Sequence, residues 1–293
     1  MKKAVFTNPW LPYALLLPQM SIIAVFFLWP AFEAIRTSFY IQDPFFGTAT
    51  FVGIDNYTDA IGKSDYLRTA NFTLWFTVIV SVGSLALGLI LAVAADRVLR
   101  GASTYKTTLM WVYAIAPPVA GLIGVMLFDQ HIGPIVDFFA LFGWEMQIGV
   151  SYYDTAFAMT VVATWKHVPY NFIFFLSGLQ SIPNSLREAA AIDCGSRFKR
   201  FWTIIFPLLA PTSFFLLIIN ITYALFETFG TVDTMVKGEP GNNPVTLVYK
   251  VFQDGFRGLD VGGSAAQSVI LMILVLALTI IQFRLIERHV HYT

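Results

Sequence analysis

The sequence has little charge, one cysteine and no block of basic residues. Of its 293 residues, 12% are Asp, Glu, Lys or Arg, whereas about 25% is usual for a soluble domain. The hydrophobic share is 57%, so a soluble globular protein is nearly excluded. The 18 basic and 18 acidic residues cancel, and the basic patch that nucleic-acid binding requires is missing. The lone Cys194 excludes a disulfide framework and a cysteine-based metal site, which needs several thiolates.

Long uncharged runs are the strongest signal in this sequence. A helix rises ~1.5 Å per residue and a hydrocarbon core is ~30 Å thick, so about 20 apolar residues cross a membrane. Uncharged runs of at least 22 residues cover 4–32, 69–95, 107–128, 201–226 and 261–283. A sixth candidate, 155–179, is interrupted by Lys166 and His167, and we count it as a span with a buried charge. The sequence therefore predicts an all-α integral membrane protein with six transmembrane helices.

The N-terminus shares one feature with a secretory signal, because Lys2 and Lys3 precede an apolar stretch. That stretch is longer than an apolar signal region of about 7 to 15 residues, and no clear small-x-small cleavage site follows. We therefore expect a first membrane helix over 10–32, with Trp10 and Trp29 as interfacial anchors. An outer loop over 33–68 and core helices over 69–283 follow.

The distribution of Lys and Arg predicts the orientation, since positive charge near span ends stays on the cytoplasmic side. With the N-terminus inside, the inner side holds eleven such residues and the outer side holds six. The inner ones are Lys2, Lys3, Arg97, Arg100, Lys106, Arg187, Arg197, Lys199, Arg200, Arg284 and Arg288. Both termini are therefore expected in the cytoplasm.

Prolines interrupt or border several of the predicted spans. They are Pro18, Pro117, Pro118, Pro169, Pro207 and Pro211. Proline removes an intrahelical hydrogen bond, and lipid-exposed backbone cannot recover it. Two interpretations stay open: kinks that serve helix packing, or a bundle that rocks between two packings, as a transporter does.

The inner connection over 180–203 is too long for a simple turn. Pro183 suits a first helical turn, and Ser185 with Glu188 matches a capping box, so a helix is expected to begin between Pro183 and Ser185. This capping box explains a carboxylate at Glu188 without any partner protein. A docking role for Glu188 is the competing interpretation.

The rest of this connection also has a helical pattern. Leu186, Ala189 and Ala190 share one helix face. Gly195 is expected to supply a left-handed stop, and Ser196 to cap a second helix that enters span five. A short cytoplasmic helix with a small-residue face is expected to dock into the cleft of another protein.

This connection resembles the EAA loop of ABC importer permeases. The matching residues are Glu188, Ala189, Ala190, Gly195, Ile204 and Pro207. The resemblance implies a type I ABC importer permease fold in which these residues couple the membrane subunit to a cytoplasmic ATPase. Two residues depart from the family pattern: Cys194 stands where glycine is usual, and Phe206 where leucine is usual. We interpret Cys194 as a small turn residue, since a thiol on the inner face lies in a reducing compartment.

Further segments extend the resemblance over nearly the whole chain. Segments 10–19, 51–57, 116–120 and 180–183 resemble carbohydrate-uptake permeases of the maltose-transporter type. Segments 41–44, 165–172, 188–193 and 258–268 are similar to the A-type permeases of sn-glycerol-3-phosphate importers. The resemblance implies a single multi-pass permease domain over 1–293 in a bacterial inner membrane.

The same resemblance implies a function and a set of partners. The chain would import sn-glycerol-3-phosphate or glycerophosphodiesters by alternating access. Its partners would be a second homologous permease, two ATPase copies that bind ATP and Mg, and an external binding protein. The chain itself would be non-catalytic and would bind no cofactor.

Three other functions are alternatives to the import of a glycerol phosphate. A permease for a neutral sugar of the same family stays open. An ion-coupled secondary transporter usually carries an acidic residue at depth, and no predicted span has Asp or Glu in its interior. A membrane-embedded enzyme would need a nucleophile, a metal set or an acid–base pair. The four histidines include no His-x-x-x-His pair, and the sequence has no phosphate-binding Gly-x-x-x-x-Gly-Lys-Ser/Thr motif.

Lys166 lies about eleven residues into span four, ~15 Å from the outer interface. One interpretation is structural: its stem snorkels outward, or its ammonium group caps carbonyls freed by Pro169. The other is that Lys166 offers a passing phosphate a compensating charge. In that case its partners in the pathway would be Tyr170, Asn171, Asn220 and Tyr223.

Overall fold

The computed structural model describes residues 10–43, 47–96, 102–236 and 243–289. By their contacts, the described residues within 1–66 and 251–274 form one compact unit, and those within 67–250 and 275–293 form a second. The single permease domain expected over 1–293 stays a prediction.

Helices make up most of both units. The α-helices are α1 (Leu11–Ile23), α2 (Trp29–Thr37), α3 (Asp55–Gly62), α4 (Ser64–Asp96), α5 (Ala102–Ala114), α6 (Pro117–Leu127), α7 (Pro134–Ala140), α8 (Tyr152–Ser181), α9 (Asn184–Asp193), α10 (Arg197–Arg200), α11 (Phe206–Leu208), α12 (Ala210–Thr222), α13 (Phe229–Met235), α14 (Leu247–Phe252) and α15 (Val261–His289). The π-helical segments are η1 (Ala24–Leu28), η2 (Phe201–Ile205), η3 (Tyr223–Glu227) and η4 (Gln253–Arg257). Strands β1 (Tyr40–Gln42) and β2 (Ala49–Phe51) form an antiparallel hairpin, so the fold is mostly helical and not all-α.

In the first unit, α1, η1 and α2 run without a break from Leu11 to Thr37. The expected end at residue 32 was therefore too early. The run of uncharged residues marks the apolar part of a helix, but an ion pair of 3.0 Å between Arg36 and Glu33 supports the helix beyond that part. Within the described unit, this helix has no buried residue.

The expected outer loop over 33–68 is more ordered than predicted. It contains the end of α2, the hairpin, α3 and the start of α4. The side-chain amide of Asn56 on α3 donates to the carbonyls of Ser38 and Tyr40, at 2.8 and 3.0 Å. Gly262 on α15 approaches the Tyr40 carbonyl so closely that a β-carbon would collide with it. One amide and one glycine thus join the hairpin to the helices around it.

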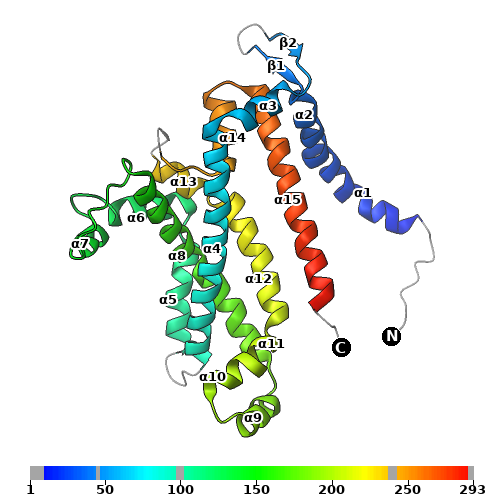
Figure 1. The fold of residues 1–293 in the computed structure, drawn as a ribbon. Coiled ribbons are helices and arrows are strands. Elements are labelled where there is room, and N and C mark those ends of the chain that lie inside the picture. The colour runs from blue at the N-terminus through cyan, green and yellow to red at the C-terminus, as the bar shows by residue number, and fades with distance from the viewer. Residues whose placement is uncertain (1–9, 44–46, 97–101, 237–242, 290–293) are drawn as a thin grey trace. The chain divides into compact units, whose positions relative to one another are not determined.

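In the second unit, α4, α8 and α12 pack around buried apolar side chains. Phe72 and Phe76 of α4 belong to one hydrophobic cluster, and Phe172 of α8 with Leu216 of α12 to another. Close approach of α4 to α8 requires Gly88, where a β-carbon would lie 2.5 Å from the β-carbon of Asn171. The short helices α9 and α10 lie beyond one end of this group, and α6 and α13 near the other (Figure 1).

The third expected span is broken. Residues 104–114 and 117–127 form two helices bent by 98°. Ala116 between them is extended, with φ −63° and ψ 144°, because the residue before a proline avoids the helical region. The side chain of Thr231 on α13 donates to the carbonyl of Pro117 at 3.0 Å. The uncharged run over 107–128 thus forms two helices and not one, and the proline pair is the reason for the bend.

Residues 245–250 pack against other helices of the second unit. Leu247 and Tyr249 of α14 are buried. The backbone NH of Leu247 donates to the Thr73 hydroxyl of α4 at 2.9 Å. The Tyr249 hydroxyl donates to the carboxylate of Asp233 at 3.1 Å.

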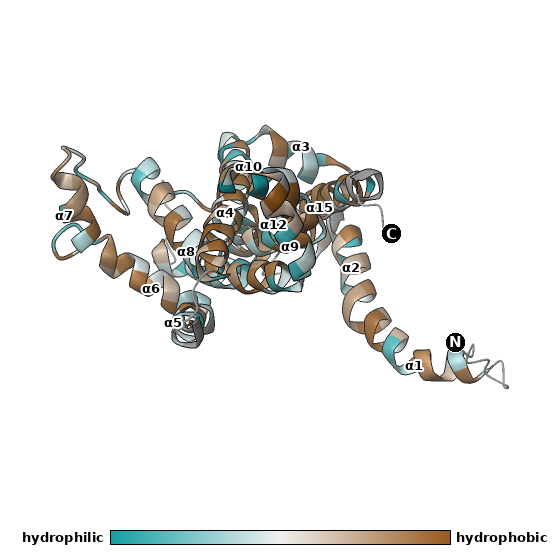
Figure 2. Cartoon of the chain, turned by 90° about the horizontal axis from the view of Figure 1, so that it is seen from below, coloured by the Kyte–Doolittle hydropathy of each residue, from teal (hydrophilic) through white to brown (hydrophobic). Residues whose placement is uncertain are grey.

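Among the described residues, four helices are long and apolar enough to cross a membrane, or up to five if the bent pair counts as one span. The four are Leu11–Thr37, Ser64–Asp96, Ala210–Glu227 and Val261–Arg284. The helix α8 has 30 residues but is not among them, since it carries buried polar side chains. Hydrophobic residues dominate the long helices, and hydrophilic ones gather on α9 and α10 (Figure 2). Six spans and two cytoplasmic termini stay predictions.

Candidate functional site

The segment that resembles a coupling loop begins where the sequence predicted. The helix α9 starts at Asn184, between Pro183 and Ser185. The predicted capping box is wrong, because Pro183 occupies the N-cap position and Ser185 lies inside the helix. Within the described chain no side chain caps this end. Glu188 is exposed on α9, so the capping explanation for its carboxylate falls away.

The end of α9 does not use a left-handed glycine. Gly195 is not among the residues with positive φ. Instead Cys194 leaves the helix in an extended conformation, with φ −119° and ψ 108°. Ser196 precedes α10 as predicted, with φ −106° and ψ 130°, although no cap hydrogen bond from its side chain is found in the described chain. Because extended residues turn the chain here, a non-glycine residue at position 194 is tolerated sterically.

Cys194→Gly is therefore expected to leave uptake unchanged. The Cys194 sulfur lies 3.9 Å from the Thr203 hydroxyl, a weak contact, and the added backbone freedom of glycine costs roughly 0.5 to 1 kcal/mol. Uptake by membrane vesicles, with Cys194→Ser as the control, measures the effect. Loss of uptake in both variants, with normal membrane insertion, would contradict this reading and assign the thiol a role.

The exposed face of α9 differs from the predicted one at two residues, Ala190 and Ile192. Ala190 is 3% exposed and packs inside the chain, so the predicted outward face of Leu186, Ala189 and Ala190 is wrong at that position. Leu186 and Ala189 are exposed, as is Glu188. Ile192, which the sequence interpretation missed, is 85% exposed. An apolar side chain this open beside a free carboxylate is typical of a docking surface.

The two remaining residues of the coupling motif follow α10. Ile204 is half-buried in the π-helical segment η2, and Pro207 is exposed in α11. Gly195 has open space around its α-carbon. Their roles in coupling stay predictions.

Arg187 fixes α9 to two long helices. One guanidinium nitrogen lies 2.9 Å from the Asp96 carboxylate at the end of α4. The other terminal nitrogen donates to the carbonyl of Leu179 on α8. Arg187 thus connects α9 to both α4 and α8. Sequence reasoning missed this pair; the only signal was Asp96 as the charge that ends the uncharged run 69–95.

Lys166 lies among aromatic rings in the interior of the second unit. It is 7% exposed, and its ammonium nitrogen is 5.7 Å from the ring centroid of Tyr113 on α5. The rings of Tyr113 and Tyr170 are 5.8 Å apart. Glu227 at the end of η3 acts electrostatically on Lys166. The structure thus brings Lys166 and Tyr170 together, and it adds Tyr113 and Glu227, which the sequence interpretation did not name.

Tyr223 has a different neighbour. Its ring stacks on His167 with centroids 3.8 Å apart and planes 9° apart. The Tyr223 hydroxyl donates to the carbonyl of Ala163 at 3.1 Å. Tyr223 is buried, so it joins η3 to α8. A direct part in a substrate pathway stays a prediction.

Asn171 and Asn220 form a closed polar network. Both are 0% exposed, and their side-chain amides exchange two hydrogen bonds of 2.9 and 2.7 Å. The Ser84 hydroxyl donates to the Asn220 oxygen at 2.5 Å. The network ties α4, α8 and α12 together through groups that would be costly to leave unpaired in an apolar environment. These contacts favour a helix-joining role, and the pathway role stays a prediction.

Asn220→Leu is expected to destabilise the protein by ~1 to 3 kcal/mol, the cost of leaving buried polar partners unpaired. Replacing both Asn171 and Asn220 with Leu should cost less than the sum of the two single changes, because the double change leaves fewer orphaned groups. Unfolding of the purified chain in detergent measures all three variants. Additive effects would show that the two amides do not act as a pair.

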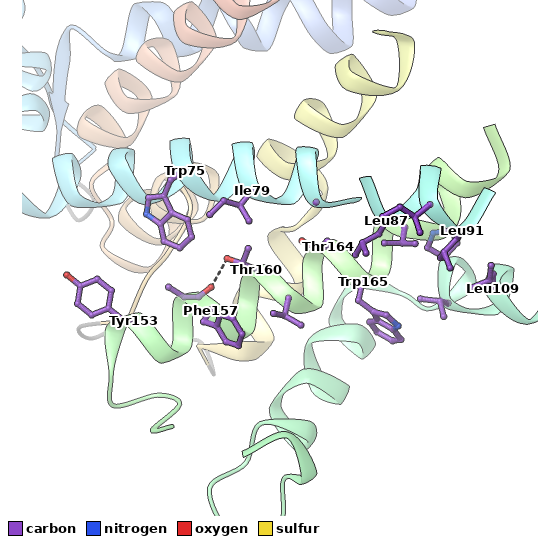
Figure 3. Close-up of a pocket in the computed structure, with 17 residues that line it drawn as sticks. Trp75, Ile79, Leu87, Leu91, Leu109, Tyr153, Phe157, Thr160, Thr164 and Trp165 are labelled. Carbon is purple, nitrogen blue, oxygen red and sulfur yellow. Dashed lines mark hydrogen bonds between the residues drawn. The ribbon is translucent and has the colours of Figure 1, made fainter. Parts of the chain in front are cut away.

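An apolar groove of about 730 Å³ runs between α4, α5 and α8 (Figure 3). Trp75 and Ile79 of α4 line it opposite Phe157 and Trp165 of α8. The hydroxyl of Thr160 donates to the carbonyl of Ala156 at 2.7 Å, so its proton is not available to the phosphate oxygens of a ligand. The groove offers a phosphate ester no charged group, and the polar centre around Lys166 is the better candidate for its passage.

Comparisons with known proteins identify the family of this chain. Residues 84–292 match the family described as "Binding-protein-dependent transport system inner membrane component". A relative from Brucella abortus, named sn-glycerol-3-phosphate transport system permease protein UgpA, is 47% identical over 100% of both chains. A protein of the same name from Rhizobium meliloti is 45% identical over 100% of both chains. Another from Yersinia enterocolitica is 45% identical over 98% of this chain and 97% of its own.

Solved structures support the same fold. A bacterial ABC transporter involved in the import of the acidic polysaccharide alginate has a TM-score of 0.79 at 18% identity, covering 96% of each chain. An inward-facing MetNI methionine ABC transporter has a TM-score of 0.55 at 16% identity, covering 77% of this chain and 96% of the other. The fold is therefore a mostly helical permease fold of the ABC importers. From the match over 84–292 and the full-length relatives, the chain belongs to the inner membrane components of binding-protein-dependent transport systems.

Proposed function

We propose that this chain moves sn-glycerol-3-phosphate, or glycerophosphodiesters, into the cytoplasm. One observation carries the proposal: full-length relatives from several bacterial genera are sn-glycerol-3-phosphate permeases at 44 to 47% identity. The chemistry of the second unit supports it. Lys166 supplies a buried cation inside the helix bundle, and a phosphate ester needs such a charge to leave water.

The transport complex would contain this chain, a second homologous permease, two ATPase copies and an external binding protein. A structural neighbour is an alginate ABC transporter in complex with a substrate-bound periplasmic protein, which supports the last of these partners. ATP and Mg would be bound by the ATPases. Six spans with both termini in the cytoplasm complete the proposal, supported by the Lys and Arg distribution and by the 30-residue length of α8.

Coupling would pass through α9. Glu188, with its exposed neighbours Leu186, Ala189 and Ile192, would enter a groove of the ATPase. Closure of the ATPases would move α9, and the contacts of Arg187 with Asp96 and Leu179 would carry that movement to α4 and α8. The proline-broken helix pair α5–α6 provides a bend that such a movement can change.

The substrate would pass near Lys166, and the hydroxyls of Tyr113 and Tyr170 would be its hydrogen-bond partners. Glu227 would be the counter-charge of Lys166 when no substrate is bound. A neutral sugar is the second candidate, because the paired rings of Tyr113 and Tyr170 also suit a sugar face. A neutral sugar, however, has no negative charge that could pair with the ammonium group of Lys166.

Uptake by cells that lack the chromosomal permease gene tests the proposal. The chain is expressed with its partner genes, and labelled sn-glycerol-3-phosphate, glycerophosphocholine, maltose and glycerol are compared. The proposal expects uptake of the first two that requires the binding protein. Uptake of maltose alone would instead support the neutral-sugar candidate.

A further inference from the structure

A cavity of about 250 Å³ lies beside the coupling segment, within the second unit. It is bounded by the end of α4, the end of α8, and the segment from α9 through α10 to η2. The residues that line it are Val93, Asp96, Leu179, Arg187, Arg197, Arg200, Phe201 and Ile205. At about 30 Å³ per water molecule, it has room for a phosphate group and part of its hydration shell.

The charged side of this cavity is strongly basic. Its lining contains three arginines and one carboxylate. Asp96 is already paired with Arg187 at 2.9 Å. In the described part of the chain, no ion pair forms at Arg197 or Arg200. The buried Nε of Arg187 also has no hydrogen-bond partner in that part. The cavity therefore has an excess of positive charge and unused donors.

The rest of the cavity lining is apolar. It consists of Val93, Leu179, Phe201 and Ile205. A small, fully hydrated anion gains no binding free energy from contact with these apolar side chains. A ligand with a phosphate joined to a hydrocarbon chain matches both sides at once, and basic pockets between membrane helices commonly take the head groups of anionic lipids.

We propose that this cavity binds the phosphate group of an anionic phospholipid such as phosphatidylglycerol. Arg197 and Arg200 hold the phosphate oxygens through paired N–H donors, and the glycerol and upper acyl carbons lie on the apolar wall. The lipid thereby braces α9 against α4 and α8. The inference depends on the proposed function only for the side of the membrane, since a cytoplasmic coupling segment would draw the lipid from the inner leaflet.

Native mass spectrometry of the full-length chain in detergent tests the proposal. The wild-type chain is mixed with equal amounts of phosphatidylglycerol and phosphatidylcholine and is compared with Arg197→Gln/Arg200→Gln. The wild type is expected to retain phosphatidylglycerol preferentially, and the double variant at least tenfold less. Lys199→Gln is the matched control, because it removes the same charge from the same helix at a position outside the cavity. An unchanged preference in the double variant overturns the proposal, as does an equal loss in Lys199→Gln.

A second double variant guards against misfolding. Arg197→Lys/Arg200→Lys keeps the charge and should retain part of the lipid preference.

A further measurement identifies the source of the phosphate. Inorganic phosphate in phosphatidylcholine nanodiscs should not raise the melting temperature of the wild type as phosphatidylglycerol does. An equal rise would identify a free-anion site and overturn the lipid assignment. ATP hydrolysis of the complex is also compared in phosphatidylglycerol and in phosphatidylcholine. If Arg197→Gln/Arg200→Gln lowers it equally in the two lipids, an acidic ATPase residue fills the cavity and the proposal fails. Normal substrate uptake beside a failed lipid result would leave the proposed function standing.

Discussion

Glu188→Gln is expected to lower uptake at least about tenfold while the chain still inserts and assembles. The side chain is exposed on α9, and within the described residues no hydrogen bond or ion pair occupies its carboxylate. A charge-assisted contact to the ATPase would be worth ~1.5 to 3 kcal/mol, which is a factor of about 10 to 150 in an equilibrium constant. Glutamine keeps the shape and removes the charge.

The controls for this result lie on the same helix. Ser185→Ala tests the capping explanation and should be neutral, because α9 begins before Ser185 and no capping bond forms there in the described chain. Uptake into membrane vesicles and co-purification of the ATPase measure both variants. Wild-type uptake by Glu188→Gln, or an equal loss in Ser185→Ala, would remove Glu188 from the coupling surface.

Lys166→Met is expected to reduce uptake of the phosphorylated substrate by tenfold or more, with assembly and basal ATP hydrolysis retained. Methionine keeps the length of the side chain and its packing near Tyr113, but it offers the phosphate no charge. Glu227, the carboxylate that acts on Lys166, is exposed and stays hydrated after the change, so no buried charge is left unpaired and the melting temperature should not fall. Lys166→Arg retains the cation and should keep part of the activity.

The structural interpretation of Lys166 predicts a different result. If the ammonium group only caps carbonyls near Pro169, then Lys166→Met should lower the melting temperature, and transport should fall only as far as the amount of folded protein falls. Transport rate per assembled complex separates the two interpretations. Unchanged uptake per complex would return Lys166 to a purely structural role.

The sequence predicted those features that depend on local chemistry. Uncharged runs located the long helices, since the free energy of transferring a side chain into lipid depends on that side chain and not on its tertiary contacts. Pro183 located the start of α9. The similarity over 84–292 also agreed with the predicted family. Helix ends were less predictable, because a surface ion pair such as Arg36 with Glu33 continues a helix past its apolar part.

Contacts between distant segments could not be predicted from the pattern alone. Arg187 and Asp96 are 91 positions apart, and Asn171 and Asn220 are 49 apart. No local periodicity says that such residues meet, so the network of Asn171 and Asn220 was interpreted as part of a pathway. The burial of Ala190 was missed for the same reason: helix spacing predicts which residues share a face but not what covers that face.

ATP hydrolysis by the reconstituted complex tests the central claim most directly. The chain, its partner permease and the ATPases are placed in proteoliposomes, and the binding protein is added with sn-glycerol-3-phosphate, with maltose, or alone. We expect hydrolysis to rise several-fold only when the binding protein and sn-glycerol-3-phosphate are both present, and we expect Glu188→Gln to abolish this rise. Stimulation by maltose with no response to sn-glycerol-3-phosphate would contradict the central claim.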